Sequence, residues 1–163
     1  MNVYDIKPKE EWQKILDDVC EESGMPAALV DNKNVVLQVS GERNPLCSEI
    51  RANKESLSFI CGQTQQFMTK KAKATRKPVM DACEAGLLKF LVPLFSDTDF
   101  VGSITVCGSC VPGEEIETFA IAKSTKMNEK EIVPLTEMVP EVDEEKVEDV
   151  VRRLFQEVRK DVS

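Results

Sequence analysis

Residues 87–107, LLKFLVPLFSDTDFVGSITVC, contain two long apolar runs separated by the polar segment Ser96-Asp97-Thr98-Asp99. Apolar and β-branched runs bounded by turn residues predict two neighbouring strands, at 87–95 and 100–107. Pro93 has no N–H to donate, so it indicates an edge or a bulge in the first strand. These two strands define the sheet to which the other segments must pair.

Shorter runs on the N-terminal side predict three more strands. Residues 78–82 (PVMDA) precede the long pair, while 27–31 (AALVD) and 34–40 (NVVLQVS) form a hairpin across an Asn-Lys turn. Asn tolerates the positive φ that tight turns require. Residues 45–77, between the hairpin and the last three strands, are mainly helical in pattern and include two helices, PLCSEIRAN and TQQFMTKKAKATR.

Both ends of the chain have helical patterns. An N-terminal helix carries apolar residues such as Trp12 and Leu16 at helical spacing and ends at Gly24. Three C-terminal helices follow from EEIETFAIAKST, NEKEIVPLTEM and the segment after Asp143. The last has a broad apolar face, which either packs on the sheet or pairs with a second copy or a partner.

The order helix, two strands, helices, three strands, helices predicts an α+β fold of the PAS/GAF-like type. We expect a five-stranded antiparallel sheet with crossover helices and C-terminal helices. Residues 1–24 form an N-terminal helix, 25–112 the PAS-like sensor core, and 113–163 a helical extension of the same domain. Sheets of this kind hold a ligand between one face and the crossover helices.

Composition excludes several classes of protein. The 163 residues are 42% hydrophobic and 31% charged, which is typical of a globular domain. No apolar run approaches the ~18–20 residues of a membrane helix, and the N-terminus has no apolar signal region. We therefore expect a cytoplasmic protein with no membrane contact. A net charge of −8 also disfavours nucleic-acid binding.

Histidine is absent from the sequence. This excludes Ser-His-Asp and Cys-His nucleophilic systems in their usual form, and it excludes His-ligated zinc or iron. No P-loop, GxGxxG motif or other catalytic arrangement is recognisable. We therefore expect no catalytic residues and no enzyme activity.

The cysteines are the side chains best suited to a metal. Cys47, Cys61, Cys83 and Cys107 lie on segments that this fold can bring together over one sheet face, and Cys110 follows closely. Their thiolates could hold an iron–sulfur cluster or zinc; buried, reduced thiols are the alternative. The Cys107-Gly-Ser-Cys110 motif also permits thiol–disulfide exchange, but the Pro-Gly pair after it predicts a turn instead of the required helix N-terminus.

Four stretches, LCSEIR, FICGQTQQFM, ACEAGLLKFLVPLF and VGSITVCG, resemble the PocR family of ligand-binding sensory domains. The resemblance covers roughly residues 25–112. It implies a PAS-like sensory module that binds a small organic molecule, such as a diol-type metabolite, and acts on a transcription regulator or histidine kinase. The positions that match in order are Cys47, Cys61, Cys83, Gly86, Leu87, Pro93, Gly102 and Gly108.

We therefore predict a stand-alone sensory domain for signal transduction. In the preferred version, Cys47, Cys61, Cys83 and Cys107 bind a metal or iron–sulfur cluster for redox or ligand sensing, with Cys110 as a substitute ligand. Where the family often has Gly-Gln, this chain has Cys107 and Cys110, which favours a metal over a diol. The alternative is a metal-free sensor of a small organic metabolite, diol-like or hydrocarbon-derived.

A ligand would lie between the sheet and residues 45–77. The residues expected to line its pocket are Phe59, Phe67, Met68, Glu84, Gly86, Leu87, Gly102 and Gly108. Since no DNA-binding or kinase segment is recognisable, the output partner is expected to be a separate regulator or kinase. A homodimer through the last helix is the alternative association.

Overall fold

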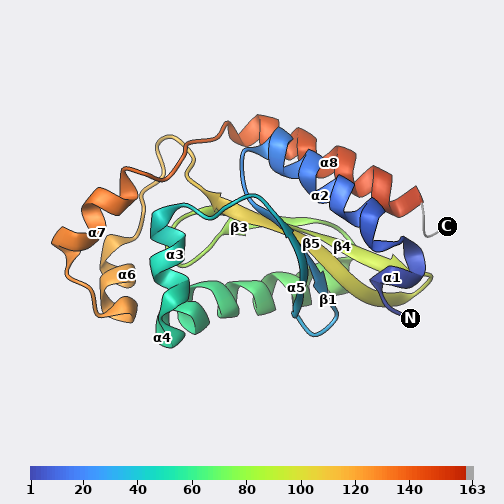
Figure 1. The fold of residues 1–163 in the computed structure, drawn as a ribbon, viewed down its shortest axis with the longest axis horizontal. Coiled ribbons are helices and arrows are strands. Elements are labelled where there is room, and N and C mark those ends of the chain that lie inside the picture. Colours follow the sequence, from blue (N-terminus) through green and yellow to red (C-terminus); the bar gives the residue numbers. More distant parts are fainter. Residues whose placement is uncertain (161–163) are drawn as a thin grey trace.

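The computed structural model describes residues 1–160 and contains a five-stranded antiparallel sheet in the order β2-β1-β5-β4-β3 (Figure 1). The longest pair is β4 with β5, in register from Leu88 opposite Ser109 to Ser96 opposite Asp99. The predicted α+β class and five-stranded antiparallel sheet are confirmed. The strands are β1 (Ala27–Asp31), β2 (Val36–Ser40), β3 (Val79–Ala82), β4 (Leu88–Ser96) and β5 (Asp99–Ser109).

Helices surround the sheet on both faces and at one end (Figure 1). They are α1 (Val3–Ile6), α2 (Lys9–Ser23), α3 (Pro45–Ala52), α4 (Lys54–Ser56), the π-helix η1 (Leu57–Gly62), α5 (Gln63–Thr75), α6 (Thr118–Thr125), α7 (Glu129–Thr136) and α8 (Glu144–Lys160). Since α4, η1 and α5 follow one another directly, the second crossover helix begins earlier than predicted. None of the helices within residues 1–160 is both long and apolar enough to cross a membrane.

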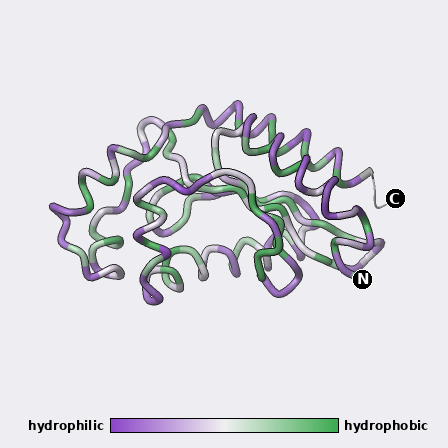
Figure 2. The backbone as a smooth tube through the Cα atoms, in the orientation of Figure 1, coloured by the Kyte–Doolittle hydropathy of each residue, from purple (hydrophilic) through white to green (hydrophobic). Residues whose placement is uncertain are grey.

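One face of the sheet is covered by α2 and α8, which lie side by side (Figure 1). Along β4, Leu88, Phe90 and Val92 point to this face and join one core cluster with Trp12 and Leu154. Both helices alternate between hydrophilic and hydrophobic residues along their length (Figure 2), as expected for helices with one buried side. The N-terminal and C-terminal helices therefore share one apolar core.

The apolar side of α8 faces this chain's own sheet. Val147, Val150, Leu154 and Val158 are each at most 3% exposed and belong to the same core cluster. Packing on the sheet therefore accounts for the broad apolar face seen in the sequence. A homodimer through this face would first require α8 to leave the sheet.

The opposite face of the sheet is covered by α5 for part of its length. Met68 and Ala72 of α5 pack against Val79 and Leu91 in a small apolar cluster. Nearer the N-terminal end of α5, the sheet is not covered by apolar side chains. That part of the face forms the cavity described below.

Pro93 lies within β4, next to the short strand β3. Pairing between β3 and β4 ends with Val79 opposite Leu91, so Pro93 is beyond the end of β3. On its other side Pro93 pairs with Ser103 of β5. Its missing N–H therefore falls where β4 is locally an edge, which agrees with the expectation from the sequence.

A third cluster lies at the end of the molecule where α3, α6 and α7 meet. Leu46 and Ile50 of α3 pack there with Ile121 of α6 and Ile132 of α7. The predicted helix over 114–125 begins only at Thr118, because the N–H of Glu117 donates to the carbonyl of Ala85 and holds the preceding residues outside the helix.

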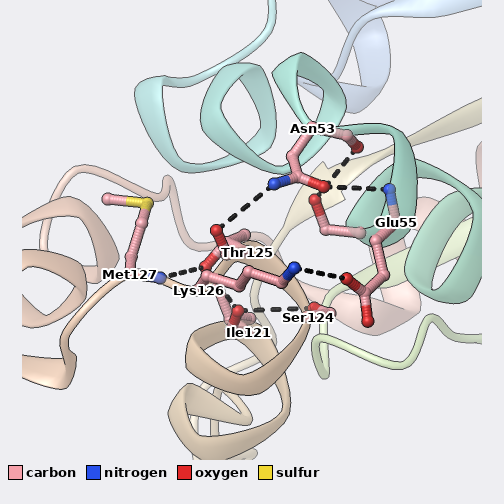
Figure 3. Close-up of polar contacts among 8 residues, drawn as sticks. Asn53, Glu55, Ile121, Ser124, Thr125, Lys126 and Met127 are labelled. Atoms are coloured by element: carbon pink, nitrogen blue, oxygen red, sulfur yellow. Dashed lines mark hydrogen bonds and ion pairs between the residues drawn. The ribbon is translucent and has the colours of Figure 1, made fainter.

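Polar contacts tie α6 to α4 at this end (Figure 3). The side-chain amide of Asn53 donates to the carbonyl of Thr125 at 3.3 Å. Lys126 forms an exposed ion pair with Glu55 at 3.7 Å. The hydroxyl of Thr125 also donates to the carbonyl of Ile121, which secures the last turn of α6.

Candidate functional site: a cavity between the sheet and α3, η1 and α5

A cavity of about 760 Å³ lies on the α5 face of the sheet. Its floor comes from three adjacent strands, with Ala28 and Val30 of β1, Lys89 of β4, and Thr105 and Cys107 of β5. In the sheet, Thr105 lies opposite Ala28 and Cys107 lies opposite Lys89. The volume is within the range of about 300–1,000 Å³ that small-molecule sites occupy.

The walls come from the crossover helices and from the segment before α3. Helix α3 contributes Cys47 and Arg51, η1 contributes Cys61, and α5 contributes Gln65 and Gln66. A π-turn is wider than an α-turn and recurs at functional sites in helices. Here it forms part of the wall that faces the sheet.

Hydrogen bonds fix the position of α5 over the floor. The amide of Gln65 donates to the hydroxyl of Thr105 and to the side-chain oxygen of Asn34, both at 3.2 Å. Thr69 donates to the same Asn34 oxygen at 3.0 Å. Asn34 has a positive φ of 63°. The left-handed residue of this turn is therefore the one that follows the predicted Asn-Lys pair. The β1–β2 turn is thereby attached to α5 at the rim of the cavity.

Asn44 caps α3 beside the floor. Its side-chain oxygen accepts from the N–H of Cys47, and its amide donates to the carbonyl of Gly108 at 2.7 Å. Gly108 has a φ of 117°, which a side chain rarely permits. This cap holds the start of α3, including Cys47, close to the end of β5.

Three of the predicted cysteine ligands line the cavity: Cys47, Cys61 and Cys107. Burial, together with the nearby thiols of Cys107 and Cys83, raises the pKa of Cys47 to about 12. Burial also raises the pKa of Cys61, although the neighbouring cations Arg51 and Lys89 oppose the shift. Both thiols are therefore protonated and uncharged at neutral pH.

The other two predicted ligands lie outside the lining. Cys83 stands beside the β3–β4 turn, where burial raises its pKa. Cys110 pairs with the segment before α8: its N–H donates to the carbonyl of Pro140, and its thiol is 3.6 Å from the same oxygen. Strand β5 continues to Ser109, and the next helix begins at Thr118, so no helix N-terminus activates this motif.

Within residues 1–160, no group of three or more Cys, Asp or Glu side chains is arranged to hold a metal ion. The fold brings the thiols of Cys47, Cys61, Cys83 and Cys107 near one another, as the mutual effects on their pKa values indicate. Proximity alone does not create a ligand set. The donor geometry therefore gives the metal hypothesis no support.

Of the residues predicted to line the ligand pocket, Gly108 does so. Phe59 and Phe67 are 38% and 58% exposed, because they lie on the outer side of the η1–α5 helix. Met68 is fully buried in the cluster with Leu91. Phe59 and Phe67 therefore point away from the sheet, whereas Met68 faces the sheet outside the cavity lining.

The remaining predicted pocket residues are also elsewhere. Glu84 is exposed, and Gly86 forms the β3–β4 turn with a φ of 85°. Leu87 is buried in the cluster near α6. Gly102 faces the opposite side of the sheet, where a Cβ would meet the backbone of Val30 and the side chain of Val3. Close packing against other elements, and not contact with a ligand, accounts for these two glycines.

The sequence interpretation missed the polar residues that do line the cavity, chiefly Lys89, Arg51 and Gln65. Lys89 carried a recognisable signal, since it is the one charged residue in the apolar run 87–95. Burying a charged side chain in such a strand is costly unless it has a partner or lines a polar site, so Lys89 indicates one of these. Arg51 and Gln65 lie on helices where polar residues are common, so they carried no comparable signal.

The fold and the cavity together define a PAS-like domain with a small-molecule cavity between its sheet and crossover helices. The chain belongs to the PocR family: the family model described as the sensory domain found in PocR matches residues 5–160. The predicted family is thereby confirmed, and the match includes the terminal helices as well as the sheet. The search of curated proteins gives no match.

Two solved structures of transcriptional regulators are weakly similar. A putative IclR transcriptional regulator from Silicibacter sp. TM1040 is 10% identical with a TM-score of 0.45, and the alignment covers 96% of this chain and 66% of that chain. The Thermotoga maritima IclR is 16% identical with a TM-score of 0.39, covering 95% and 69%. Likenesses of this strength indicate nothing about ligand or partner.

Proposed function

We propose that this chain is a non-enzymatic sensory domain that binds a small organic molecule in the cavity on the α5 face. The observation that carries the proposal is the cavity itself, an open space between the sheet and the crossover helices. It occurs in a chain that belongs to a sensory family. Uncharged thiols, the apolar side chains of β1 and β2, and a few polar groups form its lining, as is typical of small-molecule sites.

A change in the cavity would be transmitted through η1, which forms part of its wall, and through α4, which precedes η1. Helix α4 is continuous with η1, and Asn53 at its start binds the carbonyl of Thr125 in α6 (Figure 3). A ligand that shifts η1 would thus alter the contact between α4 and α6. A regulator or kinase is the expected recipient of this change.

Thermal unfolding of chelator-treated protein tests ligand binding. The probes are 1,2-propanediol, longer diols, alcohols, amides and short carboxylates. A ligand present at a hundredfold excess over its Kd is expected to raise Tm by about 5–10 °C. Ala28→Phe, which fills the floor, is expected to abolish the shift, while Ala82→Phe, at an exposed position of β3, is expected to retain it. Equal shifts in both variants would exclude the cavity as the site.

The Cys-ligated metal or iron–sulfur cluster remains a separate proposal, motivated by the sequence; Cys47, Cys61 and Cys107 line one cavity without forming a ligand set among residues 1–160. Iron, zinc and sulfide contents of protein purified without oxygen test it. If a cluster is present, Ser substitution at Cys61 is expected to remove the metal. Metal-free protein, or unchanged metal in that variant, would contradict it.

A further inference from the structure

Lys89 is a buried cation on the cavity floor. It is 5% exposed and lies between Leu88 and Phe90, which point to the opposite, fully packed face of the sheet. Strand alternation therefore directs Lys89 to the α5 face, where it lines the cavity opposite Cys107. Its environment on that face decides what the cavity can bind.

Lys89 has no partner of opposite charge in the structure. Among residues 1–160, no hydrogen bond or ion pair of its ammonium group is present, and the only fully buried side-chain N or O atom without a partner is Ser109 Oγ, so the ammonium of Lys89 opens to the cavity. The thiols nearest to it do not supply the missing charge, because Cys47 and Cys61 are protonated at neutral pH. An ammonium group on the floor of a largely enclosed cavity is less well hydrated than one on the surface, so an anion there is favoured.

The cavity as a whole is positive although the chain is acidic. Its lining includes the cations Lys33, Arg43, Arg51 and Lys89 and a single carboxylate, Glu42, a formal sum of +3. The whole chain has a net charge of −8. This local reversal favours an anion in the cavity over a cation or a neutral polar molecule.

Two of the cations converge on one place. Arg51 of α3 and Lys89 of β4 both act electrostatically on the thiol of Cys61, so their charged groups are near it from the wall and from the floor. On the β1–β2 side, Val30, Val36 and Val39 add apolar surface beside the polar residues Lys33, Asn34, Glu42 and Arg43. The cavity therefore offers cations next to Cys61 and apolar side chains on β1 and β2.

We infer that the ligand is a small organic carboxylate, whose carboxylate group binds Lys89 and Arg51 and whose apolar body lies against β1 and β2. This inference rests on the proposed function and specifies its ligand class. A phosphate ester is less suited, because phosphate sites commonly use free N–H groups at a helix N-terminus. Here the side chain of Asn44 already occupies the N–H of Cys47 at the start of α3.

Matched pairs of probes test the inference on the wild-type chain. Hexanoate and benzoate are compared with hexanamide and benzamide, which have the same shape without the charge, and with hexyl phosphate. The carboxylates are expected to bind at least tenfold more tightly than the amides in calorimetric titrations. Equal binding of acid and amide, or tighter binding of the phosphate ester, would overturn the ligand class while leaving the proposed sensory function intact.

Two lysine variants locate the contact. Lys89→Met is expected to weaken carboxylate binding about 10- to 100-fold, the loss of a charge-assisted hydrogen bond, and to leave amide binding unchanged. Lys71→Met, at an exposed position of α5 outside the cavity lining, is the control and is expected to change binding less than threefold. Equal effects of the two substitutions would contradict a role for Lys89.

A measurement without ligand separates the inference from the proposed function. Because it removes a partly desolvated charge that has no ion-pair partner, Lys89→Met is expected to leave the denaturation midpoint of the free protein unchanged or to raise it. A clearly lowered midpoint would show that Lys89 is paired inside the protein and would overturn the inference. If Lys89→Met fails to fold, Arg51→Met serves the same binding test. If no probe binds and Ala28→Phe has no effect, both the inference and the proposed function fail.

Discussion

The two faces of the sheet differ in how they are covered. On the α2/α8 face, side chains such as Trp12, Phe90 and Leu154 form one closely packed apolar core. On the α5 face, a small cluster around Met68 and Leu91 is followed by a cavity that contains Lys89 and three thiols. The first face holds the largest apolar cluster, while the second leaves an open space lined by polar side chains and thiols. The packed core and the candidate ligand cavity therefore lie on opposite faces of the same sheet.

The largest effect is expected on the α2/α8 face. Trp12 is fully buried and donates its ring N–H to the carbonyl of Val3 at 2.9 Å. Trp12→Ala is expected to reduce the free energy of unfolding by about 3–5 kcal/mol. Phe67→Ala, which truncates a 58% exposed aromatic residue on α5, is the control and should cost less than about 1 kcal/mol. Chemical denaturation measures both, and similar losses would contradict the asymmetry.

Adjacent alanines of β1 compare the faces directly. Ala27 is 2% exposed in the α2/α8 core, whereas Ala28 lines the cavity. Ala27→Leu overpacks the core and is expected to cost about 1–3 kcal/mol. Ala28→Leu enters open space and is expected to cost less than about 1 kcal/mol. If the order of the two effects in urea denaturation were reversed, the assignment of the faces would be wrong.

Alkaline pH is expected to act through the cavity face. The pKa of Cys47 rises from 9.0 to about 12 on folding, so between these values the unfolded thiol loses its proton while the folded thiol keeps it. Stability contributed by this thiol is complete below pH 9 and falls above it by about 1.4 kcal/mol per pH unit. Cys47→Ser should remove this part of the pH dependence. Unfolding curves from pH 8 to 11 for both proteins measure the difference, and parallel dependences would contradict it.

The smallest effect is expected between the two outer helices. Arg153 of α8 and Glu22 of α2 form an ion pair at 3.2 Å, with side chains 59% and 44% exposed. Because water screens such pairs, Arg153→Ala is expected to cost less than about 1 kcal/mol, and less still in high salt. A double-mutant cycle with Glu22→Ala, at low and high salt, measures the coupling. A coupling that did not weaken with salt would indicate a buried interaction.

Much of the fold could be predicted because local sequence patterns indicate where its strands lie. The runs around Phe90 and Ile104 are long and apolar, and the turn residues between them limit their pairing to an antiparallel hairpin. Trp12 and Leu16 at helical spacing likewise predicted the face by which α2 packs. These strands and helices are determined by residues close to one another in the chain, so a single sequence is enough to predict them.

The candidate site was predicted less well, because it depends on which side of each element faces the cavity. All nine residues of β4 are buried, so burial pattern could not assign Lys89 to one face. Phe67 and Met68, expected as large apolar pocket residues, lie outside the cavity lining: Phe67 is on the outer side of α5, and Met68 packs against Leu91. The order of the elements led us to expect Cys47, Cys61, Cys83 and Cys107 over one sheet face, with Cys110 close by. Cys47, Cys61 and Cys107 line the cavity, whereas Cys83 and Cys110 lie outside its lining.

The π-helix also bears on how this protein can change over generations. An α-helix advances about 100° per residue, and a π-turn contains one residue more than the α-turn it replaces. Loss of a single residue between Leu57 and Gly62 would therefore restore a regular helix and leave the orientation of α5 relative to α4 nearly unchanged, because the wide turn absorbs the extra residue. A single-codon deletion could thus change the shape of the wall beside Cys61 while α5 keeps the same side toward the sheet. Among related genes, the length of this segment, and not the identity of its residues, is then the character that would mark a change of specificity.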